Sequence, residues 1–271
     1  MTSPSDPARL LDLAVATARE AAQLVARRRD TAAQQVDVKS SPTDVVTAVD
    51  TAAEELITTR LLTARPDDGL LGEEGSARPG TTGVRWVVDP IDGTVNFLYD
   101  FPAYAVSIAA QVDGVTQVGV VLNVPTGELF TATAGGGAFL STPARPEPVR
   151  LAGSRPASLE QTLVATGFGY RADRRRAQGA VVAALLPEIR DIRRAGSAAL
   201  DLCATAAGRV DAYYELGLNP WDYAAGALVA AEAGLVVTGL PGRPFADPMA
   251  IAVAPSVAAP FVELLARLQE A

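Results

Sequence analysis

The sequence predicts an α/β protein in two halves: an N-terminal α+β half with two helices and an antiparallel sheet, and a C-terminal α/β half with a mixed sheet. Apolar residues recur at helical spacing over residues 7–63. Short runs of strand-forming residues separated by turn signals follow over 84–133, and strand and helix patterns alternate beyond residue 162. This order is typical of a layered α/β molecule, and 271 residues can bury a full core.

Two helices are predicted at the start of the chain. Asp6 can cap the first helix, Pro7 suits its first position, and the helix should end near the arginines at 27–29. Its apolar face is formed by Leu11, Val15, Ala18, Ala22 and Val25. The second helix should span 47–63, because Pro66 prevents its continuation. Both helices need a sheet to cover their apolar faces.

That sheet is expected from four consecutive strands. They are predicted at 84–88, 104–112, 116–123 and 128–133. Asp113-Gly114 and the turn at 125–127 separate the last three strands by very few residues. Connections this short favour an antiparallel meander.

The second half begins after a segment rich in glycine, proline and alanine. This segment spans 134–156, and we place the boundary near residue 145, which gives units of 1–145 and 146–271. Beyond it the prediction is a strand at 162–166, a helix at 174–186, a strand at 191–194, a helix from Ser197, a strand at 211–215, a helix from Asp222 and a strand at 235–238. Alternation of this kind indicates an α/β unit.

The composition excludes several classes of enzyme. The chain has no histidine, which removes histidine-based triads and histidine-ligated metal sites. Its single cysteine, Cys203, lies in an apolar stretch and is predicted to be a core residue. Lys39 is the only lysine and does not follow a glycine, so the Gly-Lys-Ser/Thr sequence of a Walker-type phosphate loop is absent. Lys39 could lie near a bound phosphate or metal, or be a solvated loop residue.

Charge and hydropathy argue against nucleic-acid and membrane partners. The net charge of −8 argues against nucleic acid or an anionic membrane as the main partner. No apolar stretch reaches the ~18 residues that a membrane span requires, and the N-terminus shows no secretory signal. Cytoplasm is therefore the expected location.

Acidic residues at the ends of predicted elements form the most informative pattern. Asp89 and Asp92 flank a sharp turn through Pro90 and Gly93 after a buried strand, and this turn could aim both carboxylates and the Ile91 carbonyl at one point. Read alone, the turn could equally be an Asx-type strand end. Further carboxylates occur in Gly72-Glu73-Glu74-Gly75 and Trp221-Asp222. Carboxylates brought together repel unless they bind protons or cations, so oxygen-ligated Mg²⁺ or Mn²⁺ is favoured.

Five separated blocks make the chain similar to a known family. They are 39–50, Gly72-Glu73-Glu74, Trp86 to Phe97, Gly196-Ser197-Ala198, and Glu215 followed by Trp221-Asp222 and Glu232-Ala233-Gly234. In these blocks the chain resembles the inositol monophosphatase family of Mg²⁺-dependent, lithium-sensitive phosphatases. The resemblance implies a layered αβαβα fold, a homodimer, and hydrolysis of a phosphate monoester, with myo-inositol monophosphate as the leading substrate.

The resemblance also implies a set of metal ligands for two or three Mg²⁺ ions. Glu73, Asp89 and the Ile91 carbonyl would bind one ion, while Asp89, Asp92 and Asp222 would bind a second. Asp44 would act indirectly or hold a third ion. Two cations can activate a water molecule and stabilise the attacking and leaving oxygens.

Further roles follow from the same resemblance. Thr94, hydrogen-bonded to Asp50, would orient the attacking water beside Glu73, which makes these three the catalytic residues. The phosphate would contact the turn, and the alcohol would contact residues from the second half. The implied substrate residues are Ile91, Asp92, Gly93, Thr94, Gly196, Ser197, Ala198, Glu215 and Asp222. Glu215 could instead be a surface carboxylate.

Other interpretations remain open. Gly167-Phe168-Gly169 is a loose dinucleotide fingerprint, but it comes late in the chain. A haloacid-dehalogenase-type phosphatase would need aspartates two positions apart, and Asp89 and Asp92 are three apart. A catalytically silent scaffold or regulatory protein is the alternative of another class.

The substrate also stays open among phosphate esters. Fructose 1,6-bisphosphate, histidinol phosphate and adenosine bisphosphates are alternatives to an inositol phosphate. Arginines at 171 and 174–176 could recognise a second phosphate, lie at a subunit edge or form a solvated helix face.

Overall fold

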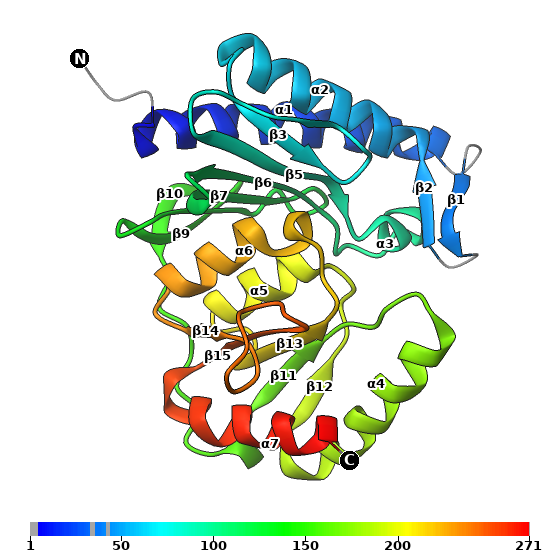
Figure 1. The fold of residues 1–271 in the computed structure, drawn as a ribbon, viewed down its shortest axis with the longest axis vertical. Helices are drawn as coiled ribbons and strands as arrows, with labels where there is room; N and C mark the ends of the chain where they lie inside the picture. Colours follow the sequence, from blue (N-terminus) through cyan, green and yellow to red (C-terminus); the bar gives the residue numbers. More distant parts are fainter. Residues whose placement is uncertain (1–4, 33–35, 42–43, 271) are drawn as a thin grey trace.

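Five layers of helices and sheets make up the computed structural model (Figure 1). It describes residues 5–32, 36–41 and 44–270, with the backbone alone for 30–32, 36–41, 44–47 and 270. The helical layers are α1 (Pro7–Ala32) with α2 (Ala48–Ala64), then α5 (Ala198–Ala206) with α6 (Pro220–Glu232), then α4 (Ala172–Leu185) with α7 (Ala258–Glu270). An eight-stranded and a five-stranded sheet separate these layers. The predicted αβαβα fold is confirmed.

The eight-stranded sheet has the order β10-β9-β8-β7-β6-β5-β3-β4. Its strands are β3 (Gly69–Gly72), β4 (Ala77–Arg78), β5 (Val84–Asp92), β6 (Ala105–Val112), β7 (Val115–Asn123), β8 (Leu129–Thr133), β9 (Gly137–Thr142) and β10 (Arg145–Arg150). The meander from β5 to β8 is antiparallel as predicted. The expectation of a wholly antiparallel sheet is wrong at one place, because β3 pairs in parallel with β5.

The five-stranded sheet has the order β12-β11-β13-β15-β14. Its strands are β11 (Leu163–Thr166), β12 (Asp191–Arg193), β13 (Ala212–Leu216), β14 (Val236–Thr238) and β15 (Met249–Val253). The first three strands are parallel and the last two pair antiparallel, which confirms the mixed sheet. Strand β15 and helix α7 were not predicted.

Smaller elements connect these layers. The hairpin of β1 (Val36–Ser41) and β2 (Asp44–Thr47) precedes α2, and α3 (Thr94–Tyr99) follows β5. In the described part of the chain, 3₁₀ turns lie at Leu159–Gln161, Leu186–Glu188 and Pro255–Val257. The division into 1–145 and 146–271 stays a prediction; β10, which begins at that boundary, pairs with β9 of the first sheet.

Buried side chains fill each interval between the layers. One cluster lies between α1, α2 and the first sheet, where Trp86 and Leu61 are fully buried. A second joins the other face of that sheet to α5 and α6, and includes Cys203 as predicted for a core residue. Two more clusters cover the faces of the five-stranded sheet. Because α5 and α6 pack on both sheets, they hold the two halves of the chain together.

Among the described residues, no helix is both long and apolar enough to cross a membrane.

Candidate active site

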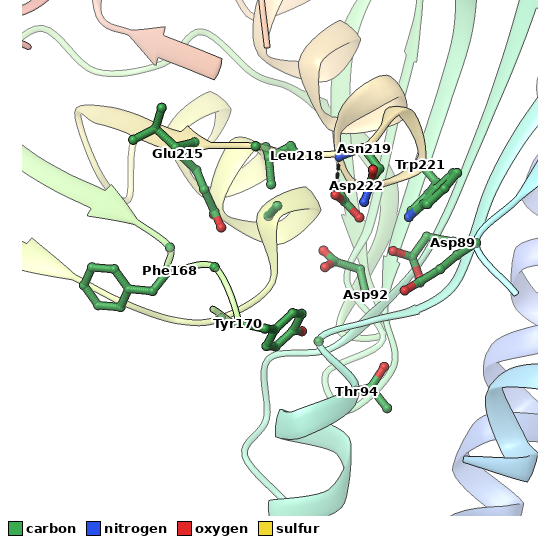
Figure 2. Close-up of a pocket in the computed structure, with 18 of the residues that line it drawn as sticks. Asp89, Asp92, Thr94, Phe168, Tyr170, Glu215, Leu218, Asn219, Trp221 and Asp222 are labelled. Atoms are coloured by element: carbon green, nitrogen blue, oxygen red, sulfur yellow. Dashed lines mark hydrogen bonds between the residues drawn. The ribbon is translucent and has the colours of Figure 1, made fainter. Parts of the chain in front are cut away.

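A cleft with a volume of about 550 Å³ lies where the end of β5 faces the N-terminal ends of α5 and α6. Most of the predicted site residues line it: Glu73, Asp89, Ile91, Asp92, Gly93, Thr94, Gly196, Ala198, Glu215 and Asp222. In Figure 2 the carboxylates of Asp89, Asp92 and Asp222 face a common space, with Glu215 across the cleft. The fold therefore brings together acidic residues from both halves of the chain.

A sharp turn at the end of β5 places the first two aspartates. The strand predicted at 84–88 is longer than expected: β5 continues to Asp92, with a change of register between Asp89 and Asp92. The turn comes at Gly93, whose φ of 95° favours glycine. A Cβ atom at Gly93 would lie 2.9 Å from the Ala103 carbonyl oxygen. The irregular strand end and the glycine together direct Asp92 into the cleft.

Backbone amides hold one oxygen of each of these carboxylates. Asp89 Oδ1 accepts a hydrogen bond from the Ile91 N–H at 3.0 Å. Asp92 Oδ2 accepts from the Ser197 hydroxyl at 2.6 Å and from the Ala199 N–H at 2.7 Å. Asp222 Oδ2 accepts from the Asn219 N–H at 2.6 Å (Figure 2). These bonds fix the direction of each carboxylate.

The helix that carries Asp222 begins two residues earlier than predicted. Helix α6 starts at Pro220, after Asn219, and proline suits the first helical position because it has no N–H to donate. Asp222 therefore lies in the first turn of the helix. Ser197, predicted as a substrate residue, does not line the cleft. It caps α5 and binds Asp92 instead.

Burial and mutual repulsion raise the pKa values of these acids. The pKa of Asp89 is well above its usual value, first because of burial and then because of the negative charges of Glu73, Asp92 and Asp222. Burial raises the pKa of Asp92 to about 6, although Ser197 and Ala199 stabilise its charged form. Burial also raises the pKa of Asp222. Such a cluster binds protons or cations readily.

The chemistry of these donors fits a hard divalent cation. Carboxylates and a backbone carbonyl are the ligands that Mg²⁺ prefers. Within the described side chains, no group of three or more acidic or cysteine residues is already placed to hold a metal ion. Trp221 Nε1, which also belongs to the cleft lining, is buried without a hydrogen-bond partner in the described part of the chain. An orphaned donor here is consistent with a site that takes a polar ligand.

The predicted contact between Thr94 and Asp50 is present. The Thr94 hydroxyl lies 3.0 Å from Asp50 Oδ1 and 3.1 Å from the Ile91 carbonyl oxygen, and both are acceptors. Asp50 is buried in the first turn of α2. Since the hydroxyl can donate its single proton to one of these acceptors, the lone pairs of the Thr94 oxygen can accept a hydrogen bond from a water molecule.

Glu215 lines the cleft and is not a surface carboxylate. Its Oε2 atom accepts a hydrogen bond from the Tyr213 hydroxyl at 2.8 Å. Burial raises the pKa of Glu215 to about 7, although this hydrogen bond and the charge of Arg194 favour its charged form. Arg194 lies over the Phe168 ring, 5.9 Å from its centroid, and also lines the cleft.

The arginine cluster is exposed and only partly directed at the cleft. Arg171 forms an ion pair with Asp173 at 2.7 Å, and Arg171 and Arg174 both belong to the cleft lining. The loop 167–170 leads into α4 and forms part of the same wall. A dinucleotide fingerprint would instead lie in the first parallel unit of a sheet.

The sequence analysis and the described cleft do not cover the same residues. Asp44 and Lys39 belong to the stretch whose backbone alone is described. Trp221 and Arg194 were not assigned to the site. Trp221 could have been identified as the neighbour of Asp222, whereas nothing in the local pattern distinguishes Arg194 from the other exposed arginines.

A family model described as "Inositol monophosphatase family" matches residues 6–270. The chain is 47% identical over 285 aligned residues to "Inositol-1-monophosphatase SuhB" of Mycobacterium tuberculosis, covering 99% of this chain and 97% of that protein. It is 42% identical over 235 residues to "Nus factor SuhB" of Escherichia coli, covering 86% of each. The solved structure of Mycobacterium tuberculosis SuhB superposes with a TM-score of 0.83 at 43% identity, over 97% of this chain and 98% of that one.

Proposed function

This chain belongs to the inositol monophosphatase family and is a phosphoric monoester hydrolase, and we propose that it hydrolyses a myo-inositol monophosphate to inositol and phosphate with Mg²⁺. The observation that carries this proposal is the convergence of Asp89, Asp92 and Asp222 in one cleft that Glu215 also lines. The first three suit a divalent cation, and Glu215 suits a substrate rich in hydroxyl groups.

We assign the metal ligands as Glu73, Asp89, the Ile91 carbonyl, Asp92 and Asp222, with Asp44 as an indirect or third-ion ligand. They would hold two or three Mg²⁺ ions, and Mn²⁺ could replace Mg²⁺. Bound Mg²⁺ would supply Lewis acidity at the phosphate and lower the pKa of a water molecule. The protein residues have the task of directing that water and the substrate.

Thr94, Asp50 and Glu73 are the proposed catalytic residues. Asp50 holds the Thr94 hydroxyl at 3.0 Å, which leaves the threonine oxygen as an acceptor for the attacking water. Glu73 lines the same cleft, so its carboxylate can accept a hydrogen bond from the other O–H group of that water. The two acceptors would orient one lone pair of the water oxygen toward phosphorus.

The substrate would lie across the cleft between the two halves of the protein. The Gly93 and Thr94 amides would bind phosphate oxygens near Ile91 and Asp92. Glu215 would accept hydrogen bonds from the hydroxyl groups of the alcohol, near Asp222. Gly196 and Ala198 would form the adjoining wall, while Ser197 would act indirectly, through its hydrogen bond to Asp92.

A phosphate-ester panel tests the substrate class. We expect Mg²⁺-dependent phosphate release to be fastest with inositol monophosphates and inhibited by Li⁺. Asp92→Asn should lower this release at least about 100-fold, because it weakens a proposed metal ligand. The exposed Asp12→Asn is the matched control and should retain full activity. Full activity of Asp92→Asn would refute the proposed metal site.

The other esters decide between substrates. A preference for fructose 1,6-bisphosphate, histidinol phosphate or an adenosine bisphosphate would replace the inositol assignment and keep the reaction class. A second candidate function is regulatory, because the Escherichia coli relative is named a Nus factor. Homodimer formation and a cytoplasmic location remain predictions.

A further inference from the structure

Glu54 is a buried acidic residue that lies outside the cleft. It belongs to α2, and only 2% of its surface is exposed. Its Oε2 atom accepts a hydrogen bond from the Glu74 N–H at 2.8 Å, and its Oε1 atom accepts from the Ser76 N–H at 2.9 Å. Both amides belong to the turn after β3, and this turn also carries Glu73. A single carboxylate therefore holds this turn through both of its oxygens.

The turn is shaped to fit this carboxylate. A Cβ atom at Gly72 would lie 2.5 Å from both Cδ and Oε2 of Glu54, so the backbone at this position lies directly on the carboxylate. The turn is closed by the Gly72 N–H, which donates to the Ser76 carbonyl at 2.7 Å. On its other side, the Glu73 N–H donates to the Val88 carbonyl at 3.2 Å. Glu73 is thus held between α2 and β5.

Helix α2 also holds Thr94, through its residue Asp50. Asp50 and Glu54 are four residues apart, so they lie on the same face of the helix. Asp50 accepts the Thr94 hydroxyl, while Glu54 accepts the amides of the turn that carries Glu73. One turn of a rigid helix therefore connects the two residues proposed to direct the attacking water.

We propose that Glu54 is a positioning residue for Glu73, and that Asp50 and Glu54 of α2 together set the spacing between Thr94 and Glu73. This inference rests on the proposed function, because it takes Glu73 as a Mg²⁺ ligand. Glutamine at position 54 keeps the shape but directs an NH₂ group at one of the two amide donors. The turn would then lose a hydrogen bond, and Mg²⁺ binding would have to order Glu73.

Calorimetric titration of the full-length protein with Mg²⁺, without substrate, tests this inference. Glu54→Gln should weaken Mg²⁺ binding about 10- to 100-fold, the range typical for residues that support metal ligands. Gly72→Ala should weaken it similarly, since the added Cβ displaces the turn while both carboxylates remain. Glu55→Gln is the matched control, because Glu55 is the exposed neighbour of Glu54 on the same helix. It should bind Mg²⁺ as the unmodified protein does.

Steady-state kinetics supply a second readout. Glu54→Gln should raise the Mg²⁺ concentration for half-maximal activity, while KM for the ester at saturating Mg²⁺ stays within about twofold. A folded Glu54→Gln protein with unchanged Mg²⁺ affinity would overturn the inference, even if its Tm were lower. If that variant does not fold, unchanged Mg²⁺ affinity in Gly72→Ala overturns it. Because calorimetry needs no turnover, a wrong substrate assignment leaves this test intact.

Discussion

Glu215 shows how strongly the surroundings of one side chain change its chemistry. It lies on β13 beside Tyr213, and burial is the largest cause of its raised pKa of about 7. Its pKa in an unfolded chain is about 4.3. The folded protein therefore binds a proton at Glu215 that the unfolded chain releases between these two values.

This difference in pKa predicts that Glu215 lowers the free energy of unfolding at high pH, and that replacing Glu215 removes this loss of stability. A raised carboxyl pKa contributes stability below about pH 4, and that stability is lost as the pH rises through about 7. Glu215→Gln should therefore increase the free energy of unfolding of the metal-free protein at pH 8 by about 1–3 kcal/mol, with little change at pH 4.5. Urea unfolding at both pH values measures this. An equal effect at the two pH values would show that Glu215 is not protonated in the folded state.

Helix α6 is the element on which the site and the core both depend. Its first turn carries Asp222, and its buried face packs between the two sheets. Gly119 of β7 allows this close approach, because a Cβ atom there would lie 2.6 Å from the Ala225 carbonyl oxygen of α6. Neither backbone can move without disturbing its own hydrogen bonds.

Gly119→Ala should therefore destabilise the protein by about 1–3 kcal/mol, which is the usual cost of overpacking a core. Because α6 would shift with Asp222, Mg²⁺ affinity should fall as well. The matched control is Gly179→Ala, in the exposed face of α4, where an added Cβ meets nothing within 4 Å. This control should be neutral or stabilising by up to about 1 kcal/mol. A stable Gly119→Ala protein would contradict the close packing of α6 on β7.

At the scale of the whole molecule, several of the acidic residues are buried rather than exposed to solvent. Asp89, Asp92, Glu215 and Asp222 all have raised pKa values, with Asp92 at about 6, and burial also raises the pKa of Asp201 on α5. Other carboxyl groups have lowered pKa values and therefore lose their protons below about pH 5. They are Glu128, Asp173 and Asp191. The change in stability between pH 5 and 8 should therefore follow the titration of these five buried acids.

We expect the Tm of the metal-free protein to fall as the pH rises from 5 to 8, on the order of 5 °C. The folded state holds protons on these acids that the unfolded chain has already released, so raising the pH favours unfolding. Mg²⁺ bound at the proposed ligands would compete with those protons, so its stabilising effect should be larger at pH 8 than at pH 5.5. Thermal unfolding with EDTA and with Mg²⁺ measures both effects. A Tm that rises with pH in EDTA would contradict the assigned protonation of the cleft.

Elements with a clear period were predictable from the sequence, whereas elements defined by their neighbours were not. Helix α2 and strands β6 and β7 lie within two residues of their predicted bounds. Strand β3 was missed because four residues that include two glycines carry no strand signal, and they are extended only through pairing with β5. The turn at Asp89 was recognised, but its exact course was decided by pairing with β6.

The sequence by itself determined the available chemistry: without histidine, and with carboxylates after strands and at helix starts, the donors suit a hard cation. The tertiary structure alone decided which of these donors meet, which are buried and therefore have raised pKa values, and that Glu54 supports the turn carrying Glu73. The physical reason is that local patterns specify period and turn geometry over a few residues. Distances between segments that are remote in the chain arise only when α5 and α6 pack on both sheets.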